Sequence, residues 1–381
     1  MTSASKPSHY FWEDRGFVRR FSTAISLHSH TQFSRELLDF IPRYSRQIPI
    51  LSNLVQRQEQ RFRDLHGHAM DYRRAWWTPP LAPREAYNLE RQQIEKDLGL
   101  HALVSLSDHD DIQAPTLLSI LPEYAHVPIS LEWTLPFENS FLHIGVHNLP
   151  RQWAPQVMER LGAYTDNPQP QDLSELLCIL NGFPSTLVVL NHPMWDELGI
   201  GAADHRALVQ RFLDDYREWI HALELNGLRG WNENAEVEKL SRAYCLPLIS
   251  GGDRHGCEPN ALVNLTNAGC FSGFVDEVRR DRHSIVLYMN HYKEPLQYRL
   301  LQGVLDVIRD YTDWPADRRR WTDRVFYQGW DGTVKRLSSL WKGDGPAIVR
   351  AFICSVRLLE SRQVRTALRM ALAEERQEVS T

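Results

Sequence analysis

The chain has 381 residues, of which 43% are hydrophobic and 24% are charged, and its formal net charge is -5. These proportions are those of a folded globular protein and exclude a disordered or fibrous chain. A single barrel of alternating strands and helices reaches this length when it carries insertions. The negative charge gives no general attraction to nucleic acid, although a local basic patch stays open.

The five cysteines, Cys178, Cys245, Cys257, Cys270 and Cys354, form no CxxC pair. An odd number of cysteines without that spacing indicates reduced thiols rather than a disulfide framework or a thiolate zinc site. Residues 1–20 are a polar lead-in without the apolar core of a signal peptide, and no run approaches the roughly 18 apolar residues of a membrane span. We therefore expect a cytoplasmic protein that does not enter a membrane, and its oligomeric state stays open.

Apolar periodicity predicts a first strand at 21–27 and then a helical insertion over about 34–77, which Pro42 and Pro49 interrupt. A helix is predicted at 85–98. Further strands are predicted at about 102–107, 127–132, 140–146, 186–190, 221–225 and 246–250, with helices at 171–180, 205–219 and 235–243. This alternation is typical of parallel strands joined by crossover helices, so the sequence predicts an α/β fold.

Beyond about residue 285 the pattern changes to two apolar stripes at helical spacing, which begin at Leu296 and Ile348. Such stripes are far more often core or subunit contacts than cofactor sites, so we assign them no chemistry. The predicted organisation is a lead-in at 1–20, a barrel domain at 21–284 that contains the insertion, and a helical C-terminal region at 285–381.

Side chains that commonly bind metals stand at or near the ends of the predicted strands. The first strand runs into His28-Ser29-His30, and two histidines separated by one residue leave the same face of a strand. This pair alone does not distinguish a metal site from the hydrogen-bonded histidines of a half-buried strand. Later strands repeat the pattern, and the candidate ligands are His28, His30, His109, Glu132, His143, His192, Asp253 and His255. In a barrel the carboxyl ends of the strands carry the chemistry, so this recurrence predicts a metal site there.

Imidazoles and carboxylates without thiolates suit zinc, manganese or iron, and a carboxylate such as Glu132 can bridge two ions. Asp108 and Asp110 flank His109 and could orient its ring as hydrogen-bond acceptors. Arg254 lies between two candidate ligands, where it is either a phosphate-binding group or a solvated arginine. Glu224 is left outside the ligand set, because a surface carboxylate is as good a reading as a residue that supports a ligand.

Taken in chain order, these residues resemble the PHP (polymerase and histidinol phosphatase) family of metal-dependent phosphoesterases. The matching pieces are His28-Ser29-His30, Ser107-Asp108-His109-Asp110, Ser130-Leu131-Glu132-Trp133, Leu142-His143-Ile144, Asn191-His192-Pro193 and Gly252-Asp253-Arg254-His255, within about residues 21–275. The resemblance implies a distorted (β/α)7 barrel with two or three divalent ions at the carboxyl ends of its strands. It also implies that a metal-bridging hydroxide hydrolyses a phosphate ester, either a small phosphorylated molecule or a nucleotide, with Asp253, Arg254 and His255 as the catalytic group.

One position departs from the family pattern. Members usually place an Asp in a Ser-Asp step a few residues after the His-x-His pair, whereas this chain has Ser34-Arg35. The third metal position is therefore lost or filled from the insertion, or Arg35 contacts an anionic substrate. The candidates from the insertion are Asp39, Asp64, His66 and His68.

Two other functions stay open. The missing Asp and the apolar C-terminal stripes are compatible with a catalytically silent PHP-like scaffold. A related barrel hydrolase that acts on C–N bonds ranks last, because amidohydrolases usually carry a carboxylated lysine at a strand end and no predicted strand end here has a lysine.

Overall fold

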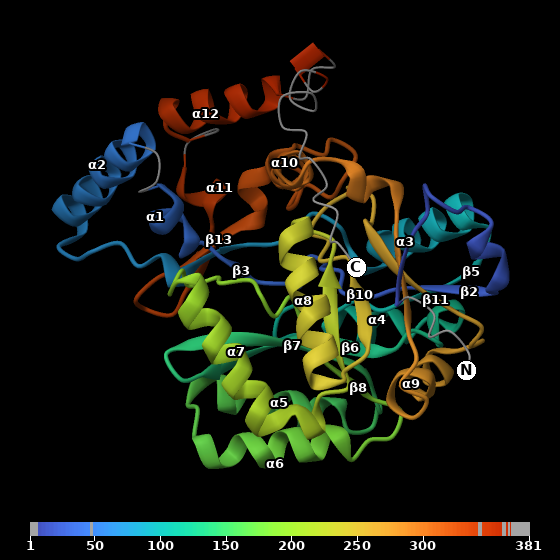
Figure 1. Cartoon of the computed structure of the whole chain (residues 1–381). Helices are drawn as coiled ribbons and strands as arrows, with labels where there is room; N and C mark the ends of the chain where they lie inside the picture. The colour runs from blue at the N-terminus through green and yellow to red at the C-terminus, as the bar shows by residue number, and fades with distance from the viewer. Residues whose placement is uncertain (1–6, 46–48, 342–344, 360–362, 365, 367–381) are drawn as a thin grey trace. The chain divides into compact units, whose positions relative to one another are not determined.

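The structure, a computed structural model, describes residues 7–45, 49–341, 345–359, 363–364 and 366 (Figure 1). It divides into two compact units. The first consists of Met1–Ser34, Leu81–Asp306 and Arg362–Thr381, and the second consists of Arg35–Pro80 and Val307–Ser361. Both units combine helices with strands, so the α/β class predicted from the sequence is confirmed.

The first unit contains two five-stranded sheets. One has the order β1-β12-β11-β2-β5 and is formed by β1 (Ser8–Tyr10), β12 (Ile285–Tyr288), β11 (Leu262–Thr266), β2 (Thr23–Ser26) and β5 (His101–Val104). β2 and β5 run parallel, whereas β11 is antiparallel to both of its neighbours. Every residue of β2 is buried, which fits the apolar strand predicted before His28.

The second sheet has the order β10-β9-β8-β7-β6. Its strands are β10 (Leu248–Gly251), β9 (Ala222–Asn226), β8 (Leu187–Leu190), β7 (Ser140–Leu149) and β6 (Ile129–Phe137). The prediction of parallel strands is confirmed for β8, β9 and β10 and is wrong for β7, which is antiparallel to both β6 and β8. Only Glu138 and Asn139 separate β6 from β7, and a two-residue connection can form a hairpin but cannot hold a crossover helix.

The expected (β/α)7 barrel is not shown by this pairing. Outside the named strands the described residues contain isolated bridges, which join Ser29 to Arg254 and His109 to Glu132, and they form no closed barrel. The physical reason is that an apolar run predicts a buried strand without specifying which strand it pairs with. The bridges nevertheless bring the segments after β2 and β5 beside those that carry Arg254 and Glu132.

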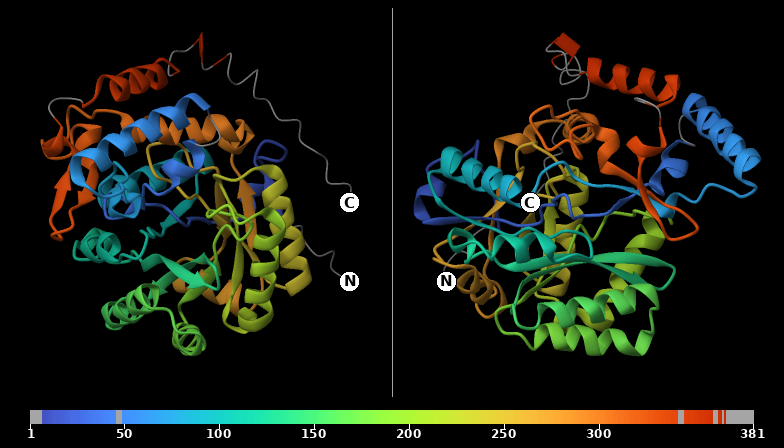
Figure 2. Two further views of the ribbon diagram at one scale, coloured as in Figure 1. Left: turned by 90° about the vertical axis from the view of Figure 1, so that its left-hand side faces the viewer. Right: turned by 180° about the vertical axis from the view of Figure 1, so that it is seen from behind.

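The helices of the first unit are α3 (Pro83–Leu98), α4 (Gln113–Leu118), α5 (Ala154–Asp166), α6 (Pro170–Asn181), α7 (Ala202–Tyr216), α8 (Trp231–Tyr244), α9 (Phe271–Arg279) and most of α10 (Leu296–Ile308). The green helices α5 and α6 lie side by side (Figure 2). Leu177, Phe212 and Val237 anchor α6, α7 and α8 in one buried cluster with strand residues of the second sheet. Among the described residues, no helix has both the length and the apolar character needed to cross a membrane.

The second unit contains a four-stranded sheet of order β14-β13-β4-β3. Its strands are β14 (Val334–Arg336), β13 (Val325–Gln328), β4 (Ala75–Trp77) and β3 (Glu36–Leu37), and its helices are α1 (Phe40–Ser45), α2 (Pro49–His66), α11 (Leu337–Leu340) and α12 (Ala347–Leu358). β4 pairs with β13, so the region read as a helical insertion and the region read as helical C-terminal residues share a sheet. Strands of two to four residues are too short to show a readable alternation. Residues 367–381 of the predicted C-terminal region lie outside the described residues.

Candidate metal centre

The backbone brings the segments that follow β2 and β10 together. The N–H of His30 donates to the carbonyl of Arg254 at 2.8 Å, and the N–H of Asp253 donates to the carbonyl of His28 at 2.7 Å. His28, His192 and Asp253 have φ values of 61°, 25° and 52°. A positive φ is uncommon in residues other than glycine and persists only where the surrounding structure holds it. Three of the predicted ligands therefore stand on backbone that the fold constrains.

One oxygen of the buried Glu132, on β6, faces three histidines that follow strands of the first sheet. Its Oε2 lies 2.8 Å from Nε2 of His28 and 3.4 Å from Nε2 of both His30 and His109. The Glu132 side chain is 1% exposed, so these imidazoles are its environment in place of water.

The other oxygen of Glu132 faces residues of β7 and the segment after β8. Its Oε1 lies 3.1 Å from Nε2 of His192 and 3.5 Å from Nδ1 of His143, and it accepts a hydrogen bond from Asn191 at 3.0 Å. The two oxygens of one carboxylate thus point at different sets of histidines, which is the arrangement a bridging carboxylate needs.

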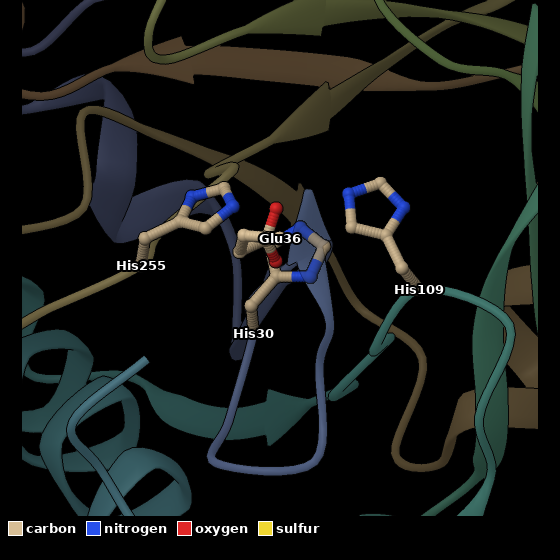
Figure 3. A group of neighbouring side chains, drawn as sticks. All are labelled: His30, Glu36, His109 and His255. Atoms are coloured by element: carbon tan, nitrogen blue, oxygen red, sulfur yellow. The ribbon is translucent and has the colours of Figure 1, made fainter. Parts of the chain in front are cut away.

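Asp253 supplies the second candidate carboxylate ligand. Its Oδ1 lies 3.7 Å from Nε2 of His28, 3.6 Å from Nε2 of His30 and 3.6 Å from Nδ1 of His255. The rings of His255 and His109 stack on the two sides of the His30 ring, with centroid distances of 4.2 Å and 4.8 Å (Figure 3). All eight predicted ligands therefore lie in one cluster within the first unit.

Three overlapping groups in this cluster offer ligand atoms within 4.8 Å of one another: His28 with His30 and Glu132, His28 with His192 and Asp253, and His109 with Glu132 and His143. Two ligand atoms bound to one ion at about 2.0–2.2 Å lie about 3–3.5 Å apart in tetrahedral or octahedral geometry. The N···O separations of 2.8–3.7 Å seen here match that spacing. The donor types and their spacing therefore fit divalent ions.

The electrostatics of the cluster favour positive charge at His28. Burial lowers the pKa of His28, but Glu132, Glu224 and Asp253 outweigh it and raise that pKa well above its usual value. Burial raises the pKa of Glu132, yet the neighbouring His28 and His109 hold that pKa well below its usual range. The buried carboxylates thus create a position that stabilises a cation.

Glu224, which we left outside the ligand set, fixes the geometry of His28. Its Oε1 lies 2.5 Å from Nδ1 of His28, and its Oε2 accepts the N–H of His192 at 2.8 Å and the amide of Asn226 at 3.0 Å. The residue is 1% exposed, so the alternative of a surface carboxylate is wrong. In the sequence, Glu224 stands between two leucines of a predicted strand. This pattern does not show whether its side chain faces inward or outward.

The carboxylates beside His109 hold neighbouring segments in place. Asp108 accepts both the N–H and the hydroxyl of Thr31, at 2.5 Å and 2.7 Å, and Asp110 accepts the N–H of Thr134 at 2.9 Å. Burial raises the pKa of Asp110 to about 6. These bonds tie the segments that carry His30, His109 and Glu132 to one another.

The two arginines near Asp253 differ in their partners. Arg254 is 2% exposed and forms an ion pair of 3.1 Å with the buried Glu90 on α3. This contact joins Arg254 to α3, and its role in phosphate binding stays a prediction. Arg229, which the sequence did not single out, has Nη2 3.4 Å from Oδ2 of Asp253. Its guanidinium carbon lies 3.9 Å from the centroid of the Trp195 ring.

The candidates for the missing Asp belong to the second unit, as does Arg35. These are Asp39, Asp64 and His68, together with His66, whose side chain lies outside the described residues. Glu36, directly after Arg35 in the sequence, is a further carboxylate of the second unit that we did not consider. The identity of the replacement stays a prediction.

The chain matches no family model and no curated protein. Among solved structures, an amidohydrolase from Chromobacterium violaceum, with bound sulfate and no metal, is 15% identical, and the match covers 47% of this chain and 84% of that chain at a TM-score of 0.30. A protein assigned as a metal-dependent phosphoesterase from Bifidobacterium adolescentis is also 15% identical, with 48% and 85% covered and a TM-score of 0.29. These similarities are too low to support a function.

Proposed function

We propose that this chain is a metal-dependent phosphoesterase of the PHP type. The observation that carries the proposal is the single buried cluster in which the two oxygens of Glu132 face five imidazoles. Imidazoles with carboxylates and no thiolate suit zinc, manganese or iron. Two or three ions are expected, because the three groups of candidate ligands overlap at His28 and Glu132.

The charge of the cluster supports bound cations. Glu132, Glu224 and Asp253 are all buried, with exposures of 0%, 1% and 5%. Buried carboxylates are costly unless positive charge compensates them. The imidazole of His28, which contacts all three, supplies at most one positive charge, and Arg229, which pairs with Asp253, supplies a second. Divalent cations would supply the rest.

The hydrogen bonds also set the ring nitrogens that face the centre. With a cation bound, a neutral His28 that donates its Nδ1–H to Glu224 would present the lone pair of Nε2 to that cation, beside Glu132 and Asp253. The hydroxyl of Ser34 lies 3.2 Å from Nδ1 of His30, so Nε2 is the ring nitrogen of His30 that faces Glu132 and Asp253. When bound, the cations would lower the pKa of a water molecule and offset negative charge on a phosphoryl oxygen.

Arg229 favours an anionic substrate at this centre. Its side chain is 11% exposed, and the Trp195 ring and Asp253 fix its guanidinium beside the ligands. A fixed guanidinium matches the geometry of two phosphoryl oxygens. We assign Arg229 to the binding of the substrate phosphate.

The test is to measure the metal content of the purified protein and its hydrolysis of an aryl phosphate with added Mn2+. Glu132→Gln keeps the shape of the side chain but removes its charge, so we expect loss of bound metal and at least about a 100-fold fall in kcat/KM. Glu138→Gln is the matched control, because Glu138 lies in the turn after β6 and pairs with the exposed Arg211. Wild-type protein without metal and without turnover contradicts the proposal, and metal without turnover favours the silent scaffold.

A further inference from the structure

A surface cavity of about 380 Å³ lies in the first unit, away from the candidate metal centre. Its lining includes His221, directly before β9, and Leu246, two residues before β10. The candidate ligands His192 and Asp253 instead follow β8 and β10. Because β8, β9 and β10 are parallel, the cavity lies at the amino ends of the strands whose other ends lead to the metal centre.

The charge of this cavity is predominantly positive. Arg217, Arg279 and Arg282 line it, against one carboxylate, that of Glu218. None of these four side chains forms an ion pair with another residue in the part of the chain that the structure describes. Arg217 and Arg282 are exposed, so their guanidiniums are accessible to a ligand.

Arg279 is a fixed cation whose acceptors are all neutral. Its Nη1 donates to the carbonyls of Phe183 at 2.6 Å and Thr186 at 2.8 Å, and its Nη2 donates to the carbonyl of Asn181 at 2.9 Å. Burial lowers the pKa of Arg279, although the carboxylate of Asp276, three residues earlier on α9, opposes this shift. The guanidinium therefore contributes a standing positive potential to the cavity.

The positive charges of Arg279 and Arg282 both act on the buried ring of His221. Its Nδ1 accepts the N–H of Val188 at 2.8 Å, and its Nε2 donates to the side-chain oxygen of Asn181 at 2.9 Å, so the ring is neutral. Burial, together with Arg279 and Arg282, lowers the pKa of His221 to about 3. An anion in this cavity would offset the same positive charge.

We propose that this cavity binds the phosphate group of a small molecule, with Arg217 and Arg282 as its contacts and Arg279 as a fixed source of positive charge. Guanidiniums match the oxygens of a phosphate group through paired N–H donors. The volume falls within the range of about 300–1,000 Å³ typical of small-molecule sites and exceeds what phosphate alone needs. Tyr244, which is half-buried, and the buried Leu246 also line the cavity, and the ring of Tyr244 is available to contact the rest of such a molecule.

The test is isothermal titration of the purified, metal-loaded protein with inorganic phosphate and with glycerol phosphate. The cavity predicts a binding event that Arg282→Ala weakens at least about tenfold and that Arg217→Ala/Arg282→Ala abolishes. Arg280→Ala is the matched control, because Arg280 is exposed and close in sequence but does not line the cavity. Because the cavity is larger than phosphate alone needs, we expect glycerol phosphate to bind more tightly than inorganic phosphate.

Titration of Glu132→Gln separates this cavity from the metal centre. We expect the cavity's binding event to persist in Glu132→Gln, with circular dichroism confirming the fold of each variant. Binding that Glu132→Gln abolishes and Arg282→Ala leaves unchanged would overturn the cavity while supporting the metal centre. Absence of any phosphate binding in the wild type would also overturn it.

Discussion

Glu90 and Arg254 illustrate how a single buried pair positions the segments around the metal centre. Glu90 accepts the hydroxyls of Ser26 at 2.8 Å and Ser29 at 3.0 Å, while it pairs with Arg254 at 3.1 Å. Ser26 and Ser29 flank His28 in the sequence, and Arg254 lies between Asp253 and His255. Helix α3 therefore holds both ligand-bearing segments through one carboxylate.

Removing one partner of this pair should destabilise the fold. Arg254→Met leaves Glu90 buried without its cation, so we expect the free energy of unfolding to fall by about 3–5 kcal/mol in urea denaturation. The double variant Arg254→Met/Glu90→Gln should lose less than the sum of the two single variants, because it removes both charges. An Arg254→Met protein of wild-type stability with a raised KM would instead support the phosphate-binding role predicted from the sequence.

His221 should make stability depend on pH. Its folded-state pKa of about 3 is below the unfolded value of 6.5, so the unfolded chain binds the proton first. The stabilisation is complete above about pH 6.5 and falls as the pH drops toward 3, by up to about 1.4 kcal/mol per pH unit. His221→Gln should flatten the stability profile across that window, whereas His283→Gln, at an exposed site, should not. Equal slopes for wild type and His221→Gln would contradict the neutral buried ring.

For single residues, the sequence identified the candidate ligands, because histidines and acids at the ends of apolar strands form a local pattern. The structure places all eight together. The role of Glu224 was left undecided and Arg229 was not singled out, both for a physical reason. Whether a strand carboxylate faces inward, and which residue a loop arginine contacts, depends on pairing between distant segments, which local pattern does not contain.

Among the elements, β9 and β10 together create the space that Glu224 occupies. A Cβ built on Gly251 of β10 would lie 1.5 Å from Oε1 of Glu224, the oxygen that contacts His28. Only glycine at this position of β10 leaves the carboxylate where it supports His28. The packing of two neighbouring strands therefore sets the position of a proposed metal ligand.

Gly251→Ala should consequently impair both stability and metal binding. We expect the free energy of unfolding to fall by at least about 2 kcal/mol and the bound metal to decrease, measured by urea denaturation and elemental analysis. Gly162→Ala in α5 is the control, because a Cβ there meets no atom within 4 Å and the change should stabilise the helix by about 0.5–1 kcal/mol. Normal metal content in Gly251→Ala would show that Glu224 does not fix His28.

Local periodicity predicted the elements better than it predicted their partners. Helices α6, α7 and α8 overlap the ranges expected at 171–180, 205–219 and 235–243. The antiparallel course of β7 and the division into separate sheets were not anticipated, because sheet order depends on long-range pairing. Helices α5 and α9 were also missed.

At the scale of the whole molecule, the second unit is assembled from two separated parts of the chain. β4 and β13 pair, and Trp76 stacks on Phe326 with ring centroids 5.6 Å apart. Neither segment forms this sheet alone, so a single sequence read locally assigns them to different regions. The first unit holds the candidate centre, and its stability should depend on the bound ions.

Removing the ions should lower the melting temperature of the protein. A ligand that binds only the folded state at 100 to 1,000 times its Kd stabilises that state by about 3–4 kcal/mol. Calorimetry before and after chelation, followed by added Mn2+, should show a fall and a recovery in wild type and a smaller change in Glu132→Gln. Identical melting curves with and without the chelator would argue against a structural contribution of metal.

Anomalous diffraction from crystals of the metal-loaded protein would show directly whether ions bind at Glu132. We expect at least two anomalous peaks at about 2.0–2.2 Å from ligand atoms of the cluster, one on each side of the Glu132 carboxylate. Crystals of metal-loaded protein with no peak beside Glu132, or with peaks only elsewhere in the chain, would contradict it.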